Sequence, residues 1–111
     1  MGLLDLFKPK WQHKNPGIRE RAIREIEDPS ILAQIVKAER FASIRKMVIG
    51  RIQDQAIIAD VAENDEQASV RVAAISKLNN AELLQRILDS DTNAEVKAMA
   101  QSRIDSMEKV S

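Results

Sequence analysis

The chain lacks several of the residues on which common protein chemistries depend. Its 111 residues include no cysteine, one histidine, three glycines, one tryptophan, two phenylalanines and no tyrosine. Without cysteine there are no disulfides or thiolate nucleophiles, which fits a reducing compartment. His13 alone cannot build the usual His/Cys zinc site, and a nucleophilic triad would have to pass through it. Three scattered glycines form no phosphate-binding loop. We therefore expect no enzyme activity, no metal and no cofactor.

Long apolar stretches are also missing. No segment approaches the roughly 18 apolar residues that cross a membrane. The opening residues 1–7 lack the basic leader and the long apolar core of a signal peptide. We expect a cytoplasmic protein without a membrane span.

The sequence does contain a period of 26 residues. The period is marked by an aliphatic residue followed by a basic one, at Ile18-Arg19, Ile44-Arg45, Val70-Arg71 and Val96-Lys97. The spacings between these pairs, 44−18, 70−44 and 96−70, are each 26 residues. Counting from the aliphatic marker as position zero, apolar residues recur at positions 0, 4, 5 and 8, and again at 13, 14, 17 and 18. Each set forms one stripe along a helix, because residues three or four apart share a face. Each unit is predicted to be a longer helix, a tight turn and a shorter helix.

Capping residues agree with this division. Asp28, Asp54 and Asn80 stand at position ten, where the second helix of each unit should begin, and Pro29 suits a first helical turn. Gly50 is predicted to lie inside a helix, where it costs about 1 kcal/mol relative to alanine.

The pattern predicts an all-α fold, a right-handed α-α superhelix (α-solenoid) of about four 26-residue helical-hairpin repeats. The predicted single domain has an N-terminal cap at 1–14, full repeats at 15–40, 41–66 and 67–92, and a C-terminal half-repeat cap at 93–111.

Both ends differ from the repeats in the way that caps should. The fourth repeat has no second helix, and Gln101 replaces the isoleucine of position five. A stacked array needs such a polar substitution, or an apolar lid, over its terminal repeats. The expected lid at the N-terminal end consists of Leu3, Leu4, Leu6, Phe7 and Trp11.

The run SVRVAAISKL at residues 69–78, followed by Leu83-Leu84, Ile87-Leu88 and Asp91, resembles a short HEAT-like repeat. Repeats of this kind occur in bacterial proteins, including those of the phycobilin-lyase type. The likeness covers residues 15–104 and implies the fold but no particular activity. The second resemblance is to the leucine-rich repeat variant, which alternates an α-helix with a 3₁₀ helix. We rank it second because position eight extends the first stripe beyond the length of a 3₁₀ segment.

The basic residue after each marker is the most regular polar feature, and it occurs at Arg19, Arg45, Arg71 and Lys97. Five residues before the markers stand His13, Glu39, Asp65 and Asp91. The resemblance implies a structural ladder between repeats. We interpret the basic residues in this way because a planar guanidinium satisfies a carboxylate and nearby carbonyls together. A phosphate-binding row is the alternative.

Charge is unevenly distributed although the 17 basic and 17 acidic residues cancel. Residues 1–24 carry six Lys/Arg and two Asp/Glu, a net +4; residues 25–52 carry five and four, +1; residues 53–111 carry six and eleven, −5. This distribution has three interpretations: ordinary surface variation, an anionic partner at the basic end, or head-to-tail self-association.

The basic head is the candidate anion-binding site, made of Lys8, Lys10, Trp11, His13 and Lys14. Its cations can contact phosphates and its tryptophan can stack on a base, although single-strand binders usually offer several aromatic platforms. We interpret Trp11 as part of the lid, with a stacking role as the alternative.

We expect a non-catalytic module for protein–protein interaction or scaffolding. The candidate face is the outer side of the predicted second helices, which varies between repeats while the core positions do not: Gln34, Lys37, Asp60, Glu63, Gln85, Arg86 and Asp89. The alternative function is a nucleic-acid or anionic-surface binding accessory that acts through the basic head.

Overall fold

The computed structural model describes residues 9–110. The predicted lid residues Leu3, Leu4, Leu6 and Phe7, and Lys8 of the head, lie outside the described residues. Within residues 9–110 the chain is all-helical and contains no strand. A 3₁₀ helix, η2 (Lys10–Gln12), precedes the α-helices, which are α1 (Pro16–Arg24), α2 (Pro29–Ala38), α3 (Ala42–Ile49), α4 (Gln55–Asn64), α5 (Ala68–Ile75), α6 (Ala81–Ser90) and α7 (Ala94–Val110).

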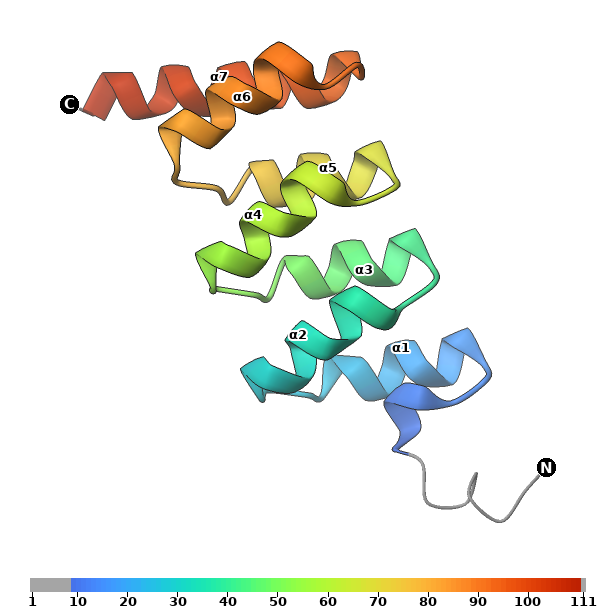
Figure 1. The fold of residues 1–111 in the computed structure, drawn as a ribbon. Coiled ribbons are helices and arrows are strands. Elements are labelled where there is room, and N and C mark those ends of the chain that lie inside the picture. Colours follow the sequence, from blue (N-terminus) through green and yellow to red (C-terminus); the bar gives the residue numbers. More distant parts are fainter. Residues whose placement is uncertain (1–8, 111) are drawn as a thin grey trace.

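Helix pairs follow one another along an elongated molecule of 54 × 26 × 17 Å, with α1 and α7 at opposite ends (Figure 1). Helices α1, α3, α5 and α7 form one layer, and α2, α4 and α6 form a second layer in front of it in this view. Within the first layer α3 packs against α5 and α5 against α7, while α2 packs on α3, α4 on α5, and α6 on α7. None of the helices in residues 9–110 is long and apolar enough to cross a bilayer.

The core lies between the two layers and consists of the predicted apolar stripes. In the second and third repeats every residue at positions 0, 4, 5 and 8 is buried: Ile44, Val48, Ile49, Ile52, Val70, Ala74, Ile75 and Leu78. Burying one such large aliphatic side chain contributes about 1.5–3 kcal/mol. Ile18 and Ala22, at the same positions of the first repeat, are only half-buried because no described helix pair precedes α1.

The relative lengths of the helices differ from the prediction. Helices α1, α3 and α5 have 9, 8 and 8 residues, whereas α2, α4 and α6 have 10 each, so the prediction of a longer first helix was wrong. Position eight lies in the turn after the first helix, where each backbone N–H donates to the carbonyl three residues earlier, at Ile26, Ile52 and Leu78. This tight turn keeps position eight directed toward the core beyond the end of the helix.

Gly50 is likewise not inside a helix. Helix α3 ends at Ile49, and Gly50 is the capping residue beyond it, with φ −61° and ψ −20°. The same position holds Ser76 in the next repeat with nearly the same backbone angles, φ −61° and ψ −17°, so this turn does not require a glycine. The predicted caps of the second helices are confirmed, because Asp28, Asp54 and Asn80 each accept a hydrogen bond from a first-turn N–H.

The C-terminal end of the described chain is formed by a single helix. Helix α7 has 17 residues, and no second helix follows it within residues 9–110. Gln101 is exposed, whereas Ile23, Ile49 and Ile75 at the same position are fully buried. A polar residue here gives the last helix a polar outer side.

Candidate functional site

The three arginines that follow the aliphatic markers, Arg19, Arg45 and Arg71, make similar contacts in successive repeats. Arg45 donates from Nε and Nη2 to the two carboxylate oxygens of Asp65, at 2.8 and 2.9 Å, and from Nη1 to the carbonyls of Glu39 and Arg40, both at 3.0 Å. The other two arginines repeat this arrangement: Arg19 with Glu39 and the carbonyls of His13 and Lys14, and Arg71 with Asp91 and the carbonyl of Asp65. All six paired side chains are 16% exposed or less.

Each guanidinium therefore joins two consecutive loops between helix pairs. The carboxylate follows the second helix of the arginine's own 26-residue unit, whereas the carbonyls belong to the loop before its first helix. The prediction placed the ladder between repeats; the ion pairs lie within a unit, and only the carbonyl contacts reach the preceding one. The hydrogen bonds to Asp65 raise the pKa of Arg45 above its usual value.

The carboxylates of this row have a second role. One oxygen of Glu39, Asp65 and Asp91 accepts a hydrogen bond from the backbone N–H two residues later, at 2.9–3.1 Å, which helps to start the following helix. His13 takes the same role in the first repeat, since its Nδ1 accepts from the N–H of Asn15 at 3.0 Å. The guanidinium groups of all three arginines therefore donate hydrogen bonds to oxygen atoms of the protein itself. The fourth basic residue, Lys97, is exposed on α7, and no ion pair with it occurs in the part of the chain that the structure describes.

Sequence reasoning missed a second row of cations, at position seven of successive repeats. Lys77 donates to the carbonyls of Ile49, Gly50 and Ile52 at 3.0, 2.9 and 2.6 Å. The other two members are Arg51, which donates to the carbonyls of Ile23 and Ile26, and Arg103, which donates to the carbonyl of Leu78 and the side chain of Asn79. These cations donate to carbonyls at the C-terminal end of the preceding first helix and in the turn that follows it, where a positive charge is favourable. Burial lowers the pKa of Lys77.

The 26-residue spacing of this row is visible in the sequence. Its role was hidden because the sequence does not show the path of the turn after the first helix. The carbonyls that these cations reach depend on that path.

All seven residues of the candidate face are exposed on α2, α4 and α6. Position 16 holds a neutral, an acidic and a basic residue in successive repeats, and position 19 holds one basic and two acidic residues. Arg86 on α6 donates to both carboxylate oxygens of Glu63 on α4, at 3.0–3.2 Å. The remaining contacts are local, between Gln85 and Asp89 and between Asp60 and Asn64. The face therefore presents different charges along one layer of the molecule.

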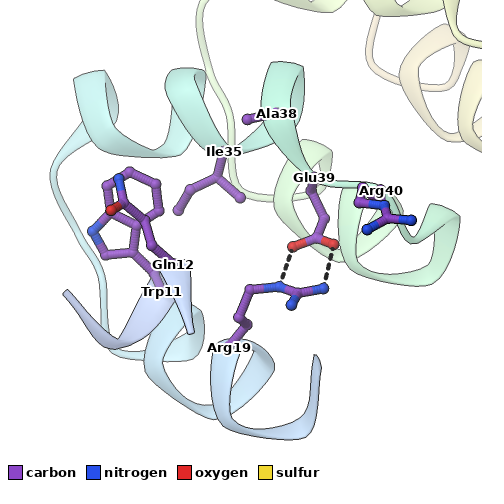
Figure 2. Close-up of a pocket in the computed structure, with 7 residues that line it drawn as sticks. All are labelled: Trp11, Gln12, Arg19, Ile35, Ala38, Glu39 and Arg40. Carbon is purple, nitrogen blue, oxygen red and sulfur yellow. Dashed lines mark hydrogen bonds and ion pairs between the residues drawn. The ribbon is translucent and has the colours of Figure 1, made fainter. Parts of the chain in front are cut away.

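The described part of the basic head places Lys10, His13 and Lys14 in solvent, while Trp11 is partly buried and packs on the core. Trp11, Ile35 and Ala38 line one wall of a pocket of about 250 Å³, and Gln12, Arg19, Glu39 and Arg40 complete it (Figure 2). Burial alone would raise the pKa of Glu39. The hydrogen bonds from Arg19 and from the N–H of Phe41, together with the charge of Arg19, outweigh burial and hold this pKa below its usual value.

No cluster of three His, Asp or Glu side chains within residues 9–110 is arranged to hold a metal ion. Two further hollows of about 440 and 520 Å³ are lined mainly by exposed polar side chains, and a third of about 490 Å³ lies over the Arg45–Asp65 pair. Comparison with protein-family models, with curated proteins and with solved structures gives no significant match. The geometry of the described residues therefore supplies the basis for a functional proposal.

Proposed function

We propose that the chain is a short right-handed α-solenoid of about four HEAT-like repeats that binds another protein as a non-catalytic interaction or scaffold module. A contrast between two sets of polar residues supports this proposal. The charged residues that recur every 26 residues, apart from the exposed Lys97, make contacts within the fold, as Arg45 and Lys77 do. The charged residues that differ between repeats are exposed on α2, α4 and α6.

The candidate face suits a partner that lies along the second layer of helices. Its three helices expose Lys37, then Asp60 and Glu63, then Arg86 and Asp89, so a partner would meet a fixed order of charges. Exposed charges of this kind contribute specificity and association rate more than raw affinity. A partner with the complementary order would be selected, and a partner with another order would meet like charges.

Affinity capture with the tagged full chain tests the proposal. The face variant combines Lys37→Glu, Asp60→Lys and Arg86→Glu. The control variant combines Arg21→Glu, Lys46→Glu and Glu95→Lys, which change net charge by the same amount at exposed positions of the other layer. We expect mass spectrometry to recover a partner with the wild type and the control variant but not with the face variant. Equal recovery with all three proteins would contradict a binding role for this face.

A second candidate is a nucleic-acid or anionic-surface accessory acting through the basic head. The observation that favours it is the exposure of Lys10 and Lys14 beside His13. Binding to phosphates by these cations would fall steeply as salt rises, because bound counterions are released. The test is binding of a single-stranded oligonucleotide and of anionic vesicles by a variant with Lys8→Glu, Lys10→Glu and Lys14→Glu. Wild-type binding that is absent, or unaffected by both salt and these changes, would rule out this function.

A further inference from the structure

Phe41 stands out among the described residues because it is the one large hydrophobic side chain exposed in residues 9–110, at 48%. It occupies the N-cap of α3, where the first and last repeats have Asn15 and Asn93. Both asparagines accept hydrogen bonds from first-turn N–H groups, and a phenyl ring cannot. Local structure therefore gives no reason for an aromatic residue at this position.

The ring of Phe41 is nevertheless held in a defined place. The guanidinium carbon of Arg19 lies 5.5 Å from the ring centroid, within the range of a cation–π contact. Arg19 is itself fixed by two hydrogen bonds to Glu39 and two to backbone carbonyls. An exposed aromatic side chain on such a rigid support loses little freedom when a partner covers it.

The pocket of Figure 2 lies near this ring, because Arg19, whose guanidinium lies over the ring, also lines the pocket. A second lining residue, Glu39, accepts a hydrogen bond from the backbone N–H of Phe41. Its volume of about 250 Å³ falls below the roughly 300–1,000 Å³ that encloses a small-molecule ligand. The apolar wall of Trp11, Ile35 and Ala38 suits one large apolar side chain of a longer molecule.

The lining of this pocket has one more cation than carboxylate, and Arg40 also borders a second hollow that contains Lys37, Asp65 and Glu66. Glu39 is its only acidic lining residue, and that carboxylate is paired with Arg19 and 3% exposed. Arg40 on the rim is exposed, and the structure shows no ion pair to it among residues 9–110. Lys10 lies next to Trp11 in η2, and Lys37 is close to Arg40 at the end of α2; both are exposed.

We propose that Phe41, this pocket and Arg40 form a docking surface for an acidic peptide segment of a partner protein. One bulky apolar side chain of the segment occupies the pocket beside Phe41, and its carboxylates contact Arg40 and the neighbouring lysines. The inference rests on the proposed protein-binding function but uses a surface that shares only Lys37 with the candidate face. Residues 1–8 of the chain itself are a poorer match, because their one acidic residue, Asp5, is balanced by Lys8.

Selection from a library of random dodecapeptides on the full-length protein tests this docking surface. We expect enrichment of peptides that combine several Asp or Glu residues with one Leu, Ile, Phe or Trp. Trp11 is the only tryptophan of the chain, so its fluorescence reports binding of an enriched peptide that lacks tryptophan. Failure to enrich any peptide, or enrichment of basic or wholly polar peptides, would overturn the proposal.

Two variants locate the binding of an enriched peptide. Phe41→Asn introduces the residue that caps the first and last repeats and so preserves the fold, and Arg40→Glu reverses the rim charge. Each should weaken binding about tenfold or more, the effect of losing a dominant contact. The matched control, Gln67→Asn, makes the equivalent cap change one repeat later and should leave binding unchanged. Circular dichroism should show that all three remain folded. Unchanged binding by Phe41→Asn would overturn the proposal.

Two further results would assign the surface to another occupant and also overturn the proposal. One is a single-stranded oligonucleotide that displaces the peptide and binds more tightly than it does. The other is peptide binding that occurs only after Leu6→Ser and Phe7→Ser, which would identify the chain's own first residues as the occupant. If the wild-type protein bound no peptide but partner capture still depended on the candidate face, this inference would be rejected and the proposed function would remain intact.

Discussion

Replacing Arg45 by alanine should destabilise the protein far more than replacing Arg86, although both side chains form two-oxygen contacts with a carboxylate. Arg45 and Asp65 are 10% and 7% exposed, whereas Arg86 and Glu63 are 66% and 32% exposed. Arg45→Ala removes four hydrogen bonds, leaves the carbonyls of Glu39 and Arg40 without this donor, and leaves the Asp65 carboxylate almost buried without its counter-charge.

The expected magnitudes differ accordingly. Removing one partner of a buried ion pair costs about 3–5 kcal/mol, because the remaining charge stays out of water. An exposed pair contributes about 0–1 kcal/mol, since solvent screens its charges. Small domains unfold with about 5–15 kcal/mol in total, so Arg45→Ala should remove a large share of the stability. Arg45→Lys keeps the charge but loses the planar fork, and we expect an intermediate loss.

Urea unfolding followed by far-UV circular dichroism measures these differences, with Arg86→Ala as the matched control. For Arg45→Ala, we expect unfolding at a lower midpoint concentration of urea, with an unchanged dependence of the unfolding free energy on urea concentration. This result would report a loss of stability without a change in the unfolding mechanism. If Arg45→Ala and Arg86→Ala lowered the free energy of unfolding by the same small amount, the structural role of the buried row would be wrong.

Three further predictions concern single residues. Lys77→Met should lower the free energy of unfolding by about 1–3 kcal/mol, since the part-buried carbonyls of Ile49 and Ile52 lose this donor. Lys77→Arg should retain most of the stability, because arginine occupies this position in the neighbouring repeats. Urea unfolding that shows no loss of stability for Lys77→Met would reject the structural role of the second row of cations. Gln67→Asn should raise the free energy of unfolding by about 1 kcal/mol, because Gln67 makes no side-chain cap to α5; a lower thermal midpoint would refute this. The pKa of Glu39 is lower in the folded state than its usual 4.5, so the stabilisation from this carboxylate is complete above pH 4.5 and is lost as pH falls through the folded pKa. Glu39→Gln should therefore flatten the acid side of the stability profile, and a profile as steep as that of the wild type would contradict this assignment.

The all-helical fold was largely predictable from the sequence because its apolar stripes depend on helical periodicity alone. The second-helix caps were also predictable, since an Asp or Asn at position ten acts on N–H groups two or three residues away. The end of each first helix was not, because Ile52 and its equivalents are apolar whether they lie in a helix or in a tight turn. The path of the turn after the helix decides which carbonyls Lys77 reaches, so the role of Lys77 could not be inferred from the sequence either.

The Phe41 surface was beyond sequence reasoning for a different reason. Trp11, Arg19 and Ile35 are distant in the sequence and meet only when η2 and α2 pack beside α1. The one available indication was a phenylalanine at a position where the other repeats have Asn or Gln. This substitution shows that residue 41 departs from the repeat pattern, but it does not reveal which residues surround Phe41.

The central claim is that recurring charges hold the fold together while variable exposed charges bind the partner. The most direct test is the dissociation constant of the captured partner, measured by calorimetry for the wild type, Arg71→Lys and the face variant with Lys37→Glu, Asp60→Lys and Arg86→Glu. We predict that Arg71→Lys lowers stability but, while folded, binds the partner with wild-type affinity. The face variant should bind at least about tenfold more weakly, as expected when dominant interface contacts are lost. Wild-type affinity of the face variant, or weakened binding by folded Arg71→Lys, would contradict the claim.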